Sequence, residues 1–167
     1  MTSEERQTIF NSRFLHVGFA EILIIQGAFE LLLEALTDDD LIGLKHKNVF
    51  FCYSSAPSSV TELRNVPAVE SLSLIDFEFE NLKQNSAEEV VAIILHEIGH
   101  VFRSADNTRQ KEFNADDFAI ERNYLHGLLS SLRRYMRTDP ERFNNEINRE
   151  RLQRLNAKER ELSKIEE

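Results

Sequence analysis

The sequence predicts one α+β domain that is mostly helical and carries a small sheet of two or three strands. The first observation is length, since 167 residues suffice for one compact domain with a core that needs no disulfides. The second is composition, which is 41% apolar and 29% charged with only 5 Gly and 3 Pro, as in helix-rich globular proteins. The third is hydrophobic periodicity, which is helical over most of the chain and strand-like only within residues 48–80.

The N-terminal part, residues 1–37, is predicted to form one long and mostly buried helix. Gln26, Glu30 and Glu34 share one side of this helix at 100° per residue, while apolar residues fill the other side. The acidic run that starts at Thr37 is expected to end it. The stretch 14–36 is apolar, but its glutamates argue against a membrane span, so we expect a buried helix of a cytoplasmic protein without a signal peptide.

The sheet is expected within residues 48–80. The segments 48–53 and 71–80 are of strand type, and a loop is predicted between the first of them and Pro67. In the second segment the alternation changes phase between Leu74 and Ile75. Either a β-bulge or a strand buried on both faces near its start would produce this pattern.

Three further helices are predicted after the sheet, over residues 86–103, 108–137 and 140–167. The first begins at Ser86, with Glu89 at capping-box spacing. The last has a sparse apolar stripe and many charges, and the arginines from Arg133 to Arg154 are interpreted as a solvated surface rather than a nucleic-acid site. Three roles stay open for this last helix: protrusion, pairing with another subunit, or cover over a cleft.

Charge and cysteine content exclude two classes of function. With 20 basic and 29 acidic residues the net charge is −9, which disfavours nucleic acid and anionic membranes as partners. The one cysteine, Cys52, excludes zinc sites built from several thiolates. It is interpreted as a small buried residue, with ligation of zinc in a latent form as the alternative.

The strongest motif is the HEIGH run at residues 96–100, an H-E-x-x-H pattern on the predicted helix 86–103. Residues four apart lie about 40° from each other around a helix and about 6 Å apart along it, so His96 and His100 can reach one ion. Neutral imidazoles suit Zn²⁺. Glu97 lies close enough to take a proton from a zinc-activated water without being a ligand itself.

The third ligand is expected from the next helix. The chain between His100 and Glu112 has room for one helical turn, a reversal at residues 104–107 and a return toward the imidazoles. Two imidazoles, a carboxylate and a water form the open site that catalysis requires. Asp116, one turn beyond Glu112, is placed to accept the second N–H of a ligating histidine, for which His96 is the first choice.

HEIGH followed by EFNAD resembles the gluzincin group of zinc metallopeptidases, in the branch with HtpX and CaaX-prenyl-protease relatives, and the ImmA/IrrE-type proteases share a similar pairing. The resemblance covers about residues 50–120 and implies a compact, zincin-like fold with the sheet beside the metal-binding helix. It implies that His96, His100 and Glu112 bind zinc, that Glu97 is the base and that Asp116 supports a histidine. It also implies that the strand 71–80 pairs with a peptide substrate and that residues 1–37 form a backing helix.

We therefore expect a zinc metalloendopeptidase, a hydrolase that cleaves peptide or protein substrates with Glu97 as general base and acid. The alternatives are a catalytically silent zinc-binding regulatory or interaction module, and an ImmA-like protease that controls a repressor. An oligomer through the C-terminal helix is possible. The residue that stabilises the oxyanion is not identified, since His126 and Tyr124 lie too far along the helix or around it if that helix is straight.

Overall fold

The computed structural model describes residues 1–54, 59–64 and 71–164, and it divides into two compact units, Met1–Ala87 and Glu88–Glu167. The described chain is mostly helical with one small mixed sheet, which confirms the α+β class. The single domain over 1–167, and the placement of the sheet beside the metal-binding helix, stay predictions. In the described chain no helix combines the length and the apolar character that a bilayer crossing requires.

The first unit begins with four short helices, so the continuous helix predicted over residues 1–37 is wrong. These helices are α1 (Ser3–Asn11), α2 (Val17–Ile25), α3 (Ala28–Ala35) and α4 (Asp38–His46). The break between α1 and α2 arises because the backbone of Phe14 bridges to Phe51 of the sheet. The break between α2 and α3 arises at Gly27, whose φ of 72° is left-handed and is favourable mainly for glycine.

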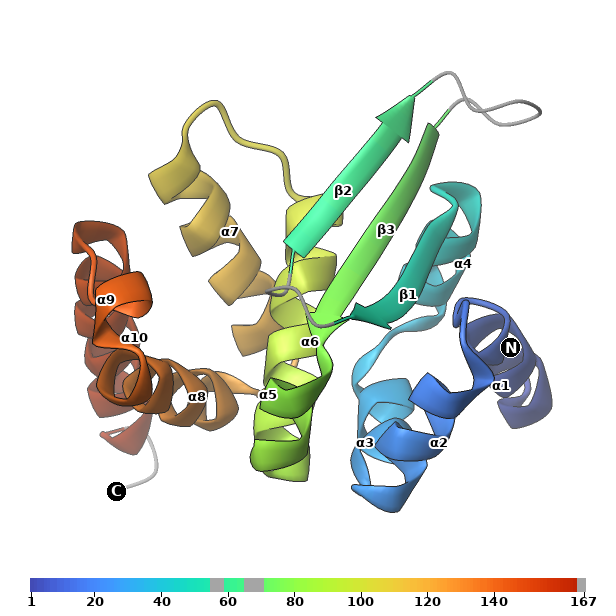
Figure 1. Ribbon diagram of the computed structural model, residues 1–167, viewed down its shortest axis with the longest axis horizontal. Helices are drawn as coiled ribbons and strands as arrows, with labels where there is room; N and C mark the ends of the chain where they lie inside the picture. Colours follow the sequence, from blue (N-terminus) through green and yellow to red (C-terminus); the bar gives the residue numbers. More distant parts are fainter. Residues whose placement is uncertain (55–58, 65–70, 165–167) are drawn as a thin grey trace. The chain divides into compact units, whose positions relative to one another are not determined.

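The sheet has three strands in the order β1-β3-β2, with β3 in the middle (Figure 1). Strand β1 (Val49–Ser54) runs parallel to β3 (Ser71–Glu78), whereas β2 (Ser59–Arg64) runs antiparallel to it. The loop predicted before Pro67 is therefore wrong in part, because its middle forms the edge strand β2. The short helix α5 (Phe79–Gln84) follows β3 directly, so this strand ends two residues before the predicted end.

The β-bulge considered for the middle strand is wrong. Pairing of β3 with both neighbours runs without interruption, from Ser73 opposite Val49 onward and through Leu74 and Ile75. Ile75 and Phe77 point to the buried face, while Leu72 and Leu74 are half-buried on the other. The change of phase therefore reflects a strand with apolar contacts on both faces.

Aromatic packing forms the core of the first unit. Phe10, Phe51 and Phe77 are fully buried, and their rings form a series with centroids 6.1 Å apart for the first pair and 6.4 Å for the second. Phe29 adds a contact of 5.2 Å to Phe10, and Phe19 adds one of 5.5 Å to Phe77. These contacts attach the N-terminal helices to one face of the sheet.

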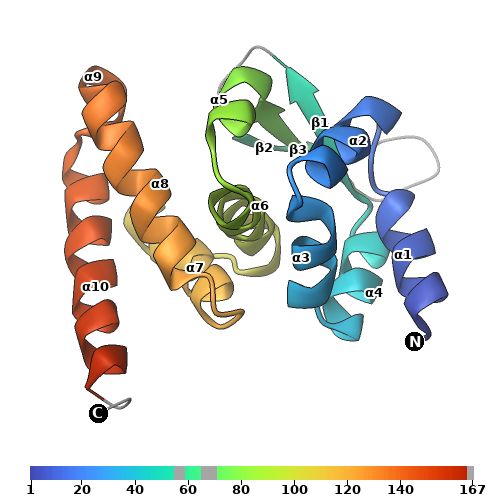
Figure 2. The same ribbon diagram turned by 90° about the horizontal axis from the view of Figure 1, so that it is seen from below.

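The second unit consists of helices. They are α6 (Ala87–Phe102), α7 (Thr108–Ile120), α8 (Leu125–Thr138), α9 (Pro140–Phe143) and α10 (Glu146–Ser163). Helix α6 confirms the helix predicted over 86–103, and α8 and α10 lie side by side (Figure 2).

The two long helices predicted at the C-terminal end are each interrupted. The helix over 108–137 breaks between α7 and α8, where Asn123 has a φ of 68°. Asparagine tolerates this left-handed conformation better than most residues. The helix over 140–167 breaks between α9 and α10, where the Asn145 side chain accepts from the backbone N–H of Asn148 and starts α10.

Candidate metal centre

Close packing between α6 and α7 brings the two halves of the sequence pattern together. A Cβ atom at Gly99 would lie 2.7 Å from the Cα of Ala115, which is closer than real side chains approach. The glycine inside the HEIGH motif therefore allows α7 to lie directly against α6. Helix α7 begins where the Asn107 side chain accepts from the backbone N–H of Gln110, so the chain reverses as expected between the two helices.

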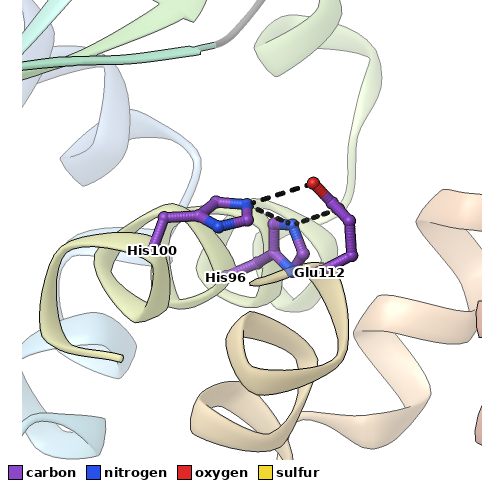
Figure 3. A group of neighbouring side chains, drawn as sticks. All are labelled: His96, His100 and Glu112. Carbon is purple, nitrogen blue, oxygen red and sulfur yellow. Dashed lines mark hydrogen bonds and ion pairs between the residues drawn. The ribbon is translucent and has the colours of Figure 1, made fainter. Parts of the chain in front are cut away.

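Three potential ligands converge from these helices. The Nε2 atoms of His96 and His100 are 3.2 Å apart, and both rings point toward Glu112 (Figure 3). The Glu112 carboxylate places Oε2 3.3 Å from Nε2 of His96 and Oε1 3.5 Å from Nε2 of His100. All the candidate ligand atoms lie within 4.8 Å of one another, so the group could hold a metal ion.

The spacing and chemistry of this donor set fit zinc. Two ligands at about 2.0–2.1 Å from a tetrahedral ion lie about 3.3–3.4 Å from each other. The 3.2 Å between the two Nε2 atoms is close to that value, and each imidazole has one oxygen of the Glu112 carboxylate at 3.3 or 3.5 Å. Two imidazoles and one carboxylate also leave a fourth position open, as in catalytic rather than structural zinc sites.

Asp116 lies behind His96 on the side away from this centre. Its Oδ1 is 2.9 Å from Nδ1 of His96, and the aspartate side chain is 0% exposed. An ionised carboxylate only accepts hydrogen bonds, so Nδ1 of His96 carries the proton and donates it. This bond directs Nε2 toward His100 and Glu112, which is the orientation that a ligating histidine needs.

The ionisable groups of the centre perturb one another strongly. Burial and the charge of Arg151 oppose protonation of His96, but its bonds to Asp116 and Glu112 outweigh them and raise its pKa to about 9. Burial and the neighbouring His96 lower the pKa of His100 to about 4. Burial acts against ionisation of Glu112, yet the bond and charge of His96 and the charge of Arg151 lower its pKa to about 2.

Glu97 lies on α6 between the two histidines in sequence and is half-buried. Burial raises the pKa of Glu97, and the negative charge of Glu112 acts in the same direction. The charges of His96 and Arg151 oppose this shift. Glu97 is therefore electrostatically coupled to the centre, and its raised pKa suits a group that must both take and return a proton.

Arg151 of α10 also reaches the centre, and sequence reasoning missed it. Its Nη1 is 2.9 Å from Oε2 of Glu112 and its Nη2 is 2.7 Å from Oδ1 of Asp116. Only 12% of its side chain is exposed, so interpreting all the arginines of this region as solvated was wrong. The sequence contains one indication that Arg151 is buried. It lies four residues from both Ile147 and Leu155, so it falls on the apolar side of this helix.

The other candidates lie elsewhere in the described chain. His126 is 70% exposed and its Nδ1 is 3.3 Å from Glu159, beside a cavity of about 460 Å³ lined by residues of α6, α8 and α10 that include none of the three ligands. The Sγ of Cys52 is 3.7 Å from the carboxylate of Asp76. Burial and this carboxylate raise the pKa of Cys52 to about 11, which disfavours the thiolate that zinc would need.

Comparisons of this chain with protein-family models, with curated proteins and with solved structures found no match.

Proposed function

We propose that this chain is a zinc-dependent metallopeptidase with a minimal, gluzincin-like form of the zincin fold. The observation that carries the proposal is the convergence of His96, His100 and Glu112, whose candidate ligand atoms lie within 4.8 Å of one another. The supporting chemistry is that of the donor set: two imidazole nitrogens and a carboxylate, with a glutamate next to the first histidine. Peptides or proteins are the substrate class that follows from this chemistry.

Each residue has a distinct task in the proposed reaction. Zinc, when bound, would polarise the scissile carbonyl and make a water acidic enough to be deprotonated near neutral pH. Glu97 accepts the proton of the attacking water and then delivers it to the leaving amine. Asp116 holds His96 in the tautomer that presents Nε2, and the buried surroundings of Glu97 keep its pKa high enough for both steps.

The test compares the wild type with Glu97→Gln for zinc content and for hydrolysis of a peptide library. We expect both proteins to bind one zinc ion, and we expect the variant to lose a factor of about 10²–10⁴ in rate, as when a general base is removed. Glu88→Gln is the matched control, because it makes the same chemical change at an exposed position of the same helix. Its rate should equal that of the wild type.

Two outcomes would contradict the proposal. Equal cleavage by the wild type and Glu97→Gln would remove Glu97 from the mechanism. Zinc binding without turnover of any peptide would favour the alternative of a regulatory or interaction module that keeps this helix pair as a scaffold. If cleavage occurs, dependence of a repressor's lifetime on the protein would distinguish an ImmA-like role from general proteolysis.

A further inference from the structure

We infer that Arg151 is a positioning residue of the metal centre and that it makes the C-terminal helix α10 part of that centre. The inference rests on the proposed zinc site and goes beyond it, because α10 lies outside the sequence pattern that predicts the ligands. Arg151 does not ligate a metal. It acts through Glu112 and Asp116.

The guanidinium of Arg151 uses both of its edges on the acidic groups of α7. Its Nε and Nη2 form a two-bond fork with the Asp116 carboxylate, at 3.0 Å to Oδ2 and 2.7 Å to Oδ1. Its Nη1 reaches Oε2 of Glu112 at 2.9 Å. Such paired contacts fix the orientation of a carboxylate as well as its charge, which a single ammonium contact does not.

The pose of Arg151 is itself constrained from within α10. Its Nη1 also donates to the side-chain oxygen of Asn148 at 3.1 Å, and Nδ2 of the buried Asn148 donates to the backbone oxygen of Phe143 at 2.9 Å. The last residue of α9 thus fixes the side chain of Asn148, and Asn148 helps to fix the guanidinium. A series of polar contacts connects the end of α9 to Glu112 through Asn148 and Arg151.

The contacts of Arg151 explain how two ligands are held at once. Asp116 accepts the fork of Arg151 on both of its oxygens, and its Oδ1 also accepts the Nδ1 proton of His96 at 2.9 Å. Because Asp116 is fully buried, rotation of its carboxylate would break one set of these bonds without water to replace it. Arg151 therefore orients His96 through Asp116, and it orients Glu112 directly.

Further ion pairs dock α10 onto α7 on either side of this contact. Arg154 pairs with Asp117 one turn farther along α10, and Arg109 of α7 places Nε 2.8 Å from Glu150. Leu155 is the one apolar residue of α10 that is fully buried in the described chain. Polar contacts thus make a large part of the surface between α10 and α7. Among them, Arg151 is the contact that also reaches the ligands, Glu112 directly and His96 through Asp116.

A charge-only role and a positioning role predict opposite signs for zinc affinity. If Arg151 mattered only as a nearby positive charge, Arg151→Met would tighten binding of a divalent cation, and Arg151→Lys would change little. If Arg151 positions Glu112 and Asp116, both variants weaken zinc binding. Methionine loses the charge and the fork, and lysine keeps the charge but loses the fork. We expect the dissociation constant to rise roughly 10–100-fold, as is usual when a group that orients a ligand is removed.

The experiment measures zinc affinity of the full chain by competition with a chromophoric chelator, for the wild type, Arg151→Met, Arg151→Lys and Arg160→Met. Arg160 is the matched control, because it is an exposed arginine of the same helix. The visible absorption of bound Co²⁺ is the second readout, since it reports ligand geometry and should change in both Arg151 variants. Circular dichroism of the metal-free proteins checks folding, and Arg151→Lys serves alone if Arg151→Met does not fold.

Amide hydrogen exchange supplies a third readout. Coupling between two sites is reciprocal, so zinc should slow exchange over Glu146–Ser163 in the wild type and slow it less in the Arg151 variants. Wild-type zinc affinity and Co²⁺ absorption in both variants would overturn the inference and leave the zinc site standing. Tighter zinc binding by Arg151→Met would also overturn it. A wild type that binds no zinc would overturn the proposed function and this inference with it.

Discussion

Zinc binding at pH 7.5 should release about one proton from His96, in addition to the proton that a zinc-bound water loses near neutral pH. In the metal-free protein the pKa of His96 is raised to about 9, so this side chain is mostly protonated at pH 7.5. Its Nε2 proton then faces Glu112 at the place where a metal would bind. Zinc must displace this proton, because only the neutral imidazole is a ligand.

The other two ligands should contribute almost nothing to this release. With a pKa of about 4, His100 is already neutral at pH 7.5, and Glu112, with a pKa of about 2, is already ionised. Glu97 also has a raised pKa, so the measurement is repeated in Glu97→Gln to remove its contribution. The apparent zinc association constant should rise about tenfold per pH unit up to about pH 9.

Isothermal titration calorimetry measures the release directly. Titrations in buffers of different ionisation enthalpy give the number of protons as the slope of observed enthalpy against buffer enthalpy. Asp116→Asn removes the negative charge beside Nδ1 of His96 and should reduce the release from His96 well below one proton, whereas Asp106→Asn, at an exposed loop position, should not. Equal proton release by the wild type and Asp116→Asn would refute the reasoning, because the zinc-bound water is common to both proteins.

Two further predictions concern stability and packing. In the metal-free protein, the raised pKa of His96 stabilises the folded state fully below about pH 6.5, and this contribution is lost as the pH rises toward 9. Urea unfolding with a chelator present should show the free energy of unfolding falling over this pH range in the wild type and not in His96→Gln. An equal fall in both proteins would contradict the raised pKa of His96. Gly99→Ala should destabilise the fold by about 1–3 kcal/mol and weaken zinc binding, because the new methyl group would displace the backbone of α7 at Ala115. Gly18→Ala is the control, since its Cβ would meet its nearest neighbour at 3.6 Å, and a loss of stability or zinc affinity as large as that of Gly99→Ala would contradict the packing argument.

Local patterns in the sequence predicted the elements whose cause is local. The HEIGH histidines lie on one side of α6 because the helical repeat requires it, and the reversal before α7 follows from the polar residues that precede Thr108. The strand over 71–78 follows from its alternating side chains. In each case neighbouring residues in the chain supply the interactions that decide the structure.

The breaks between helices could not be predicted in the same way. Continuing a helix through Gly27 or Asn123 costs only about 1 kcal/mol, which contacts elsewhere in the fold easily outweigh. The strand β2 depends likewise on pairing with β3, since an edge strand gains its hydrogen bonds from a neighbour rather than from its own sequence.

The sequence by itself determined that two imidazoles and a glutamate share one helix, and that an acidic pair, Glu112 and Asp116, follows within reach. Only the tertiary structure decided that Glu112 approaches both imidazoles, because this depends on the contact of Gly99 with α7. It also decided that Arg151 completes the charge cluster from a helix about 40 residues farther along the chain. The physical reason is that helical periodicity sets the direction of a side chain within its own helix, whereas the distance between side chains on different helices depends on how closely those helices pack.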